Sequence, residues 1–260
     1  MFCRKQLMAY LINNNANTRF TTASGQIETI GTGIFERALA DVELVIETMT
    51  DIPVDVFSIL GMRNLSAFIG ELFAKSLVKE SEDRYIGNPH QDGYPDLLLM
   101  DPHGIDLYET IRLRNGLRDK SPFSPFANGG LEIKATCGDV PTPAACARLN
   151  MNKPHIGDTR INLMMGYTWK AHHRETNNLV GILWDFLNGV PKIVAVFFGS
   201  DLSPEDWGAI VQPVEGGGRT TSVSIMKRDG ISKMYRNWIA VEDDQRYIDY
   251  INRYNRGHII

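Results

Sequence analysis

The stretches GYPDLLLM at residues 93–100 and GGLEIKAT at residues 129–136 decide the fold of this chain. Each is a short apolar run that is entered through turn-forming residues, Tyr-Pro in the first and Gly-Gly in the second. We therefore expect a strand over residues 96–100 and another over residues 131–136. Side chains alternate between the two faces of a strand, so Glu132 and Lys134 should project to one side while Ile133 enters the core.

The sequence before these strands predicts helices. Residues 34–49, IFERALADVELVIETM, carry apolar side chains at helical spacing, and Pro53 closes the segment. A second apolar-periodic run at residues 54–78 contains Gly61 and Gly70, so we expect it to break into two pieces.

The sequence after these strands alternates between strand and helix signals. We expect strands at residues 161–169, 179–186 and 190–199, the last of them buried on both faces. Ser203 and Pro204 begin an expected helix at residues 203–210, residues 222–235 suit a hairpin centred on Asp229-Gly230, and residues 244–256 are expected to be helical. The fold class is therefore α/β of a mixed α+β kind, with a central mixed sheet flanked by helices. We expect one domain over residues 1–260, with an inserted segment at 101–128.

Composition excludes several classes of protein. The chain has 260 residues, 43% of them hydrophobic and 22% charged, as in ordinary globular domains. The N-terminal segment is rich in asparagine and no apolar run approaches the length of a membrane span, so we expect a cytoplasmic protein without a membrane partner. The three cysteines lack zinc-ligand spacing. Motifs of the GxxxxGK[ST] and GxSxG kinds are missing, so a nucleotide cofactor and a serine nucleophile are not expected.

The net charge of −4 hides an asymmetry along the chain. Residues 36–109 hold 15 acidic and 5 basic side chains, whereas residues 141–175 hold 5 basic and 2 acidic ones. Residues 212–240 are also basic, with 5 basic and 2 acidic side chains. A basic stretch suits a DNA phosphate backbone and a solvated surface equally well, so charge leaves both interpretations open.

Asp96, Glu132 and Lys134 are the residues that carry the chemistry. If Asp96 faces the other two from a neighbouring strand, its carboxylate, that of Glu132 and the backbone carbonyl of Ile133 supply hard oxygen ligands suited to Mg²⁺. Glu132 and Lys134 lie among strongly apolar strand neighbours, where a charge pair without a function would be costly to desolvate.

With Asp96 in GYPDLLLM and Glu-x-Lys in GGLEIKAT, the sequence resembles the PD-(D/E)xK nuclease superfamily. The resemblance implies a restriction-endonuclease-like fold, Mg²⁺ held by Asp96, Glu132 and the Ile133 carbonyl, and Lys134 near the attacking water. It further implies a type II restriction endonuclease that cuts double-stranded DNA as a homodimer, because a two-fold symmetric protein matches a palindromic site.

The spacing between the two strands leaves rival acids open. Asp101, Asp106 and Glu109 lie in the long segment between Asp96 and Glu132 and could replace Asp96. Many members of the superfamily add a helix glutamate to the metal site, and Glu71 is the candidate here. The alternative for Glu71 is an ion pair with Lys75 one helical turn later.

Basic side chains that could contact DNA cluster in residues 141–178 and 212–236. The candidates for phosphate or guanine contacts are Arg148, Lys153, His155, Arg160, Lys170, His172, His173, Arg174, Arg219, Lys227 and Arg228. Each of them individually suits a solvated side chain as well. The adjacent histidines lack the partner spacing of a histidine-metal nuclease, so we favour a positioning role or a plain loop.

Two rival functions remain open at the level of sequence. The chain could be a non-restriction nuclease on the same scaffold, such as a repair or mobile-element enzyme. It could also be a catalytically silent DNA-binding protein whose acids serve ion pairs. The roughly 125 residues after the motif favour a sequence-specific enzyme, because base reading needs extended elements.

Overall fold

A five-stranded mixed sheet forms the centre of the protein, in the order β1, β11, β9, β8, β6. The computed structural model describes residues 10–120, 122–123, 129–167, 169–171, 178–213 and 222–255, without the side chains of 254 and 255. The strands are β1 (Tyr10–Ile12), β6 (Glu132–Thr136), β8 (Leu179–Leu187), β9 (Val190–Gly199) and β11 (Trp238–Glu242). Neighbouring strands run antiparallel except β6 and β8, which are parallel. The sheet is therefore mixed, as the sequence predicts.

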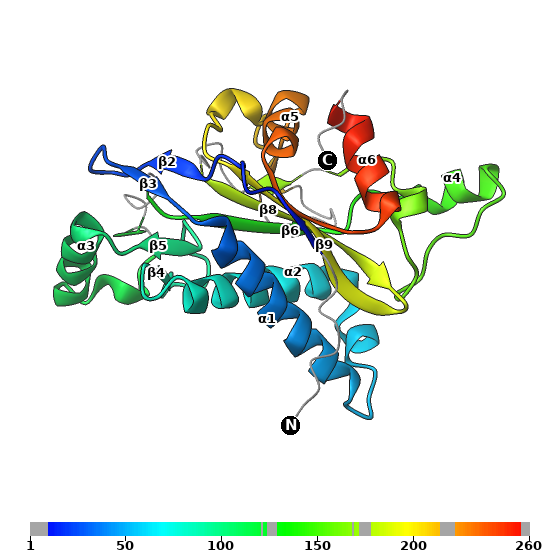
Figure 1. Cartoon of the computed structure of the whole chain (residues 1–260), viewed down its shortest axis with the longest axis horizontal. Coiled ribbons are helices and arrows are strands. Elements are labelled where there is room, and N and C mark those ends of the chain that lie inside the picture. Colours follow the sequence, from blue (N-terminus) through cyan, green and yellow to red (C-terminus); the bar gives the residue numbers. More distant parts are fainter. Residues whose placement is uncertain are drawn as a thin grey trace.

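Helices cover both faces of this sheet (Figure 1). Helices α1 (Thr32–Thr50) and α2 (Val56–Glu80) contact the sheet from one side, through β9 and β6. Helices α5 (Arg228–Arg236) and α6 (Gln245–Asn255) contact β9 and β11 from the other side. The described residues thus form a three-layer mixed α/β fold, which confirms the expected class.

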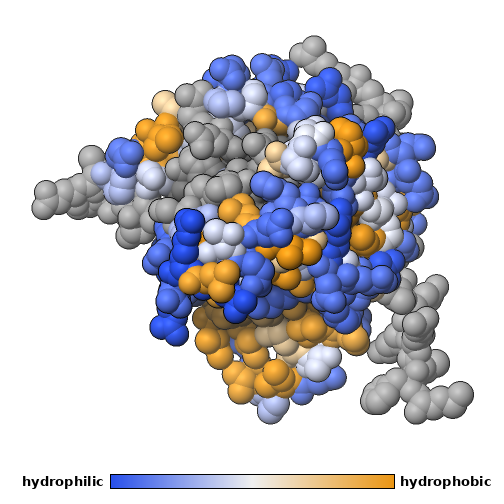
Figure 2. Space-filling model, turned by 90° about the vertical axis from the view of Figure 1, so that its left-hand side faces the viewer, coloured by the Kyte–Doolittle hydropathy of each residue, from blue (hydrophilic) through white to orange (hydrophobic). Residues whose placement is uncertain are grey.

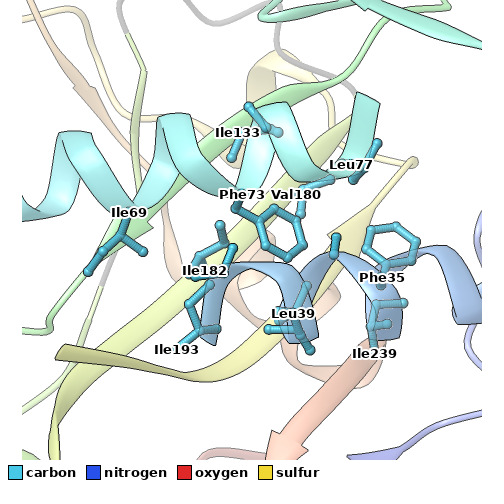
Figure 3. Close-up of a cluster of buried hydrophobic side chains, with 14 of the residues drawn as sticks. Phe35, Leu39, Ile69, Phe73, Leu77, Ile133, Val180, Ile182, Ile193 and Ile239 are labelled. Carbon is cyan, nitrogen blue, oxygen red and sulfur yellow. The ribbon is translucent and has the colours of Figure 1, made fainter. Parts of the chain in front are cut away.

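Alternation along the strands divides the interior into two cores. In β8, Val180 and Ile182 join the cluster formed with α1 and α2, and Leu183 joins the cluster beneath α5 and α6. Figure 3 shows the first cluster, in which Phe73 of α2 lies near Ile182 and Leu39. Both faces of β8 and β9 are buried, so the expectation for residues 190–199 is confirmed.

The two long helices follow the apolar pattern of the sequence. Phe35, Leu39, Val42 and Ile46 form the buried stripe of α1. The expected break in the second run occurs at Gly61, whose φ of 68° is left-handed and suits glycine. By length and composition α2 could also cross a membrane, but the residues of its second half pack against the sheet.

Shorter elements surround the central layers. They comprise β2 (Arg19–Thr21), β3 (Ile27–Thr29), β4 (Tyr85–Gly87), β5 (Leu97–Leu99), β7 (Lys170–Ala171), β10 (Ser224–Ile225), α3 (Pro102–Leu113), α4 (Pro143–Arg148) and the 3₁₀ turns η1 (Gly116–Arg118), η3 (Ile161–Leu163) and η4 (Pro204–Asp206). Helix α3 and η1 lie in the segment 101–128 that the sequence predicts as an insertion. Strands β4 and β5 pair antiparallel and carry the chain toward β6.

The strand expected at residues 161–169 is wrong for the described part of that range. Residues 161–163 form the 3₁₀ turn η3 instead, and Gly166 makes only an isolated bridge to Asp139. The buried Asp185 carboxylate accepts backbone N–H bonds from Arg160 and Ile161, which fixes this turn. A side chain distant in sequence thus supplies the partner that a strand neighbour would have supplied.

The hairpin expected at residues 222–235 is also wrong, because residues 228–236 form α5. Position 230 of this helix requires glycine, because a Cβ there would come within 2.8 Å of the Met226 side chain and 2.9 Å of Asp206. Met234 and Tyr235 point into the core. Asp229-Gly230 therefore serves the start and the packing of a helix instead of a turn.

The helix expected at residues 203–210 is reduced to the 3₁₀ turn η4. Ser203 caps the turn as expected and forms a capping box with Asp206, but the chain leaves the turn at Trp207 and bridges to Met226. The backbone N–H of Gly208 donates to Ile225. Extended pairing with residues 223–226 thus replaces further helical turns.

An apolar patch lies where α1 turns into α2, at the lower end of the molecule (Figure 2). The large apolar side chains exposed around this corner are Leu44, Ile52, Val54 and Ile59. The patch belongs to the helical layer and not to the sheet.

Candidate active site

A cleft of about 930 Å³ opens between α2, the loop after β4 and strand β6. Glu71 and Lys75 line it from α2, His90 lines it from the loop, and Asp96 and Lys134 line it from the two strands that the sequence singles out. The cleft therefore collects Glu71, Asp96 and Lys134, whereas Glu132 is not among its lining residues and reaches the site through Lys134.

A single antiparallel bridge holds the two motif strands together. The backbone groups of Leu97 and Leu131 exchange two hydrogen bonds of 2.9 Å each. One residue further along this register, Asp96 comes opposite Glu132. On its other side β6 is held by β8 and by Asn178, whose carbonyl accepts the Glu132 N–H. Two like charges are thus placed face to face at the edge of the sheet.

Lys134 lies between the two carboxylates. Its Nζ forms an ion pair with Glu132 and lies 3.5 Å from Asp96 Oδ2. It also donates to the carbonyl of Ile133 at 3.2 Å, and Asp96 Oδ2 accepts the Ile133 N–H at 2.7 Å. Ile133 itself packs in the core, as predicted. The structure therefore brings together the three side chains of the motif, while their chemical roles stay predictions.

Burial and charge act against each other at this cluster. Burial raises the pKa of Glu132 to about 7, the positive charge of Lys134 opposes that rise, and the charge of Asp96 adds to it. For Lys134, burial lowers the pKa, but the charges of Glu132 and Asp96 outweigh burial and raise it overall. The ammonium is therefore held in its charged form by the two acids.

The oxygen atoms around Lys134 fit a divalent cation. Carboxylate oxygens of Asp96 and Glu132 and the carbonyl of Ile133 all converge on Lys134 Nζ, a positive centre. Glu132 Oε2 is buried and has no hydrogen-bond partner among the described residues. Hard oxygen donors of this kind are the ligands that Mg²⁺ prefers. Within the described ranges, however, no three His, Cys, Asp or Glu side chains are gathered closely enough to form a ready metal site.

The rival acids of the inserted segment have other partners. The Asp101 side chain accepts the Gly104 N–H at 2.7 Å and caps α3. Glu109 pairs with Arg112 on the same helix, and Asp106 is exposed there. None of the three is among the residues that line the cleft. Asp96 is therefore the acid of this set that meets Glu132.

Glu71 is exposed on α2 and lines the same cleft as Asp96 and Lys134. Among the ion pairs found between described residues, none joins Glu71 to Lys75. The position agrees with a glutamate that can approach a metal from the helix side. Its participation in a metal site stays a prediction.

The basic residues expected at DNA divide into three groups. Exposed side chains belong to Arg148, Lys153, His155, Lys170, Lys227 and Arg228. Arg160 differs from the expectation, because only 7% of it is exposed and its backbone N–H donates to the Asp185 carboxylate. Its Nε finds no partner in the described part of the chain. Such a residue offers little surface to a phosphate. His172, His173, Arg174 and Arg219 lie outside the described residues.

The loop at residues 87–93 also belongs to the site, although no motif in the sequence marks it. Asn88, His90 and Gln91 line the cleft beside Asp96. The signal was available in the stretch GNPHQDGYP, which places polar side chains directly before Asp96 in the sequence. Turn formers on either side made it look like a plain connection.

Comparisons of the chain with protein-family models, with curated proteins and with solved structures found no match. The site is therefore interpreted from its own geometry.

Proposed function

We propose that this protein is a magnesium-dependent endonuclease of the type II restriction kind, which hydrolyses phosphodiester bonds in double-stranded DNA. The observation that carries the proposal is the meeting of Asp96, Glu132 and Lys134 at one sheet edge beside an open cleft. The order of the three residues along the chain agrees with the PD-(D/E)xK motif. A restriction-endonuclease-like fold and a single nuclease domain are parts of the same proposal.

The charges of the cluster suit this reaction. Two carboxylates and one ammonium leave one net negative charge, which attracts a divalent cation. With that cation bound the cluster becomes positive and attracts a phosphodiester. Asp96, Glu132 and the Ile133 carbonyl are the groups that would hold Mg²⁺, which when bound stabilises phosphate charge and acidifies a water.

Lys134 is the residue that handles water in this proposal. Its ammonium must leave the shared oxygens when a cation takes them, and its stem is long enough to turn toward the cleft. There it orients the attacking water and compensates charge on the phosphate. The water oxygen bonds to phosphorus while one bridging P–O bond breaks; the water gives up one proton to solvent, and the leaving oxygen takes one up. Glu71 would support the cation from the helix side.

Partners and location follow from the same proposal. The exposed basic side chains after the motif, Arg148, Lys153, His155, Lys170, Lys227 and Arg228, are candidates for contacts with phosphates or bases. A homodimer would place one site on each strand of a palindrome. We also propose that the protein acts in the cytoplasm, where its DNA substrate lies.

Plasmid cleavage in the presence of Mg²⁺ tests the function. Wild type should convert supercoiled plasmid into discrete products, and Glu132→Ala and Lys134→Ala should bind DNA without cutting it. Glu109→Gln is the matched control, because this acid pairs with Arg112 away from the cleft. Binding without cleavage by every variant, wild type included, would favour a silent DNA-binding protein. Cleavage that is unspecific in sequence would favour another nuclease on the same scaffold.

A further inference from the structure

His90 belongs to the loop that forms one wall of the cleft. The ring is half-buried and shares the cleft with Asp96 and Lys134. Nothing in the motif assigns a role to this residue, and no ion pair or metal cluster among the described residues uses it. Its ring is therefore available to contact a ligand that enters the cleft.

The loop is fastened to the strand that carries Asp96. The N–H of Asn88 donates to the Asp96 carbonyl, and Asn88 Nδ2 donates to the Pro95 carbonyl, both at 2.9 Å. Asn88 Oδ1 accepts the His90 N–H, also at 2.9 Å. A Cβ on Gly93 would lie 2.4 Å from Asn88 Nδ2, so this close approach requires glycine. His90 is therefore held in a fixed position relative to Asp96.

A hydrogen bond within the loop sets the tautomer of His90. The backbone N–H of Asp92 donates to His90 Nδ1 at 3.1 Å. An acceptor needs a lone pair, so the neutral ring carries its proton on Nε2. Nε2 is then protonated, and the lone pair of Nδ1 is already engaged by the Asp92 N–H, so neither nitrogen is available to a metal. The edge of the ring that bears Nε2 is turned away from Asp92 and is a hydrogen-bond donor.

We propose that His90 binds a phosphate of the substrate, donating from Nε2 to a non-bridging oxygen and so positioning the phosphodiester over Asp96 and Lys134. The inference rests on the proposed function and names a residue that the motif does not contain. A neutral donor suits this place, because it adds affinity for an anionic oxygen without repelling the cation that the carboxylates attract.

Two amide variants separate the binding role from a role in loop structure. Asparagine at position 90 can keep an acceptor near Nδ1 for the Asp92 N–H but has no group at the position of Nε2. Glutamine can place an amide donor near the position of Nε2 but loses the local acceptor. A phosphate-binding role predicts that His90→Gln retains more function than His90→Asn. A structural role in the loop predicts the opposite order.

The kinetic readout is cleavage of a DNA duplex in Mg²⁺. His90→Ala and His90→Asn should raise KM by about 10-fold, as expected for losing a hydrogen bond to a charged group, with a smaller change in kcat. His90→Gln should lie close to wild type. His103→Ala is the control, since this exposed histidine of α3 does not line the cleft and is not among the residues proposed to contact DNA. If His90→Asn outperforms His90→Gln, the proposal is overturned.

Nitrogen-15 NMR of the histidine rings, with inorganic phosphate as the probe, tests the proposal without relying on cleavage. His90 should show the Nε2–H tautomer in the free protein, and its ring signals should shift saturably with phosphate while those of His103, an exposed histidine outside the cleft, do not. An Nδ1–H tautomer, or equal shifts at both residues, overturns the proposal. If wild type fails to cut DNA while His90 still binds phosphate, the nuclease function fails and the phosphate site stands.

Discussion

Two lysines of this protein each lie between two carboxylates, yet the surroundings of the two clusters differ. Lys192 Nζ lies 3.1 Å from Glu43 Oε1 and 2.5 Å from Glu242 Oε2. The three side chains are closed in, with 5%, 15% and 8% of their surface exposed. In the other cluster, 24% of the Lys134 side chain and 31% of the Asp96 side chain are exposed, while Glu132 is as buried as Glu242, with 7% exposed.

The cavities beside the two clusters show the same contrast. The pocket next to Lys192 has a volume of about 230 Å³, against about 930 Å³ for the cleft beside Lys134. Helix α1 and the β8–β9 hairpin supply the walls of the smaller pocket, many of them apolar. The same set of charges therefore serves the packing of α1 in one place and an accessible site in the other. Access, and not the presence of paired charges, distinguishes a candidate active site.

The largest expected effect comes from removing Lys192. Lys192→Met leaves two buried carboxylates without their ammonium and should lower the free energy of unfolding by about 3–5 kcal/mol. Lys134→Met should lower it less, by about 2 kcal/mol, because it leaves one buried carboxylate, that of Glu132, while Asp96 can turn to water. Urea unfolding of both variants measures the difference. Equal losses of unfolding free energy in the two variants would show that the two clusters are equally shielded from water.

The second largest effect is a loss of cleavage rate when the charge of Glu132 is removed. Glu132→Gln keeps the shape of the side chain and removes a charge from the proposed cation site, so it should lower the cleavage rate roughly 10²–10³-fold. It should also raise the Mg²⁺ concentration required for half-maximal rate. Glu43→Gln, the matching change in the other cluster, should leave the rate of the folded protein unchanged. Similar rates for the two variants would remove the distinction between the clusters.

A smaller effect tests the rival acid Asp101. Asp101→Ala removes the N-cap of α3 and should cost about 1 kcal/mol of stability, measured by thermal unfolding. Cleavage by the folded variant should match wild type, because the Asp101 carboxylate is engaged at the N-terminus of α3 and is not one of the two that pair with Lys134. Loss of cleavage without loss of stability would assign Asp101 to the site in place of Asp96.

The smallest effect is a pH dependence of the Lys192 cluster. Burial raises the pKa of Glu242 above its ordinary value of 4.5, although Lys192 opposes the rise. The folded state then binds the proton more tightly than the unfolded chain, so this carboxyl favours folding more as the pH falls. The unfolding free energy of wild type relative to Glu242→Gln should rise between about pH 7 and pH 4. A fall over that range would contradict the direction of the shift.

Elements governed by local patterns could be predicted from the sequence, and elements governed by distant partners could not. Helix α1 and strands β8 and β9 follow their own apolar periodicity. The turn at residues 161–163 depends on the Asp185 carboxylate, and α5 depends on the close approach of Gly230 to Asp206. Neither partner is visible from the local pattern, so propensity led to strands in both places.

The candidate site shows the same division. Alternation along β6 sufficed to place Glu132 and Lys134 on one side and Ile133 in the core. The choice of Asp96 over Asp101 rested on the motif and needed the structure, because only there does the capping role of Asp101 become visible. Arg160 was expected at DNA because it is basic, but tertiary packing buries it.

The bridge between Leu97 and Leu131 has a consequence for how this protein can vary. The paired backbone hydrogen bonds of these two residues set the register that brings Asp96 opposite Glu132, and the segment between them begins and ends at this bridge. Helix α3 packs mainly on a small cluster of its own, formed by Leu98, Ile111 and Phe123. The excursion can therefore lengthen, shorten or be exchanged during evolution without moving the two acids, which makes it a natural place to acquire new specificity.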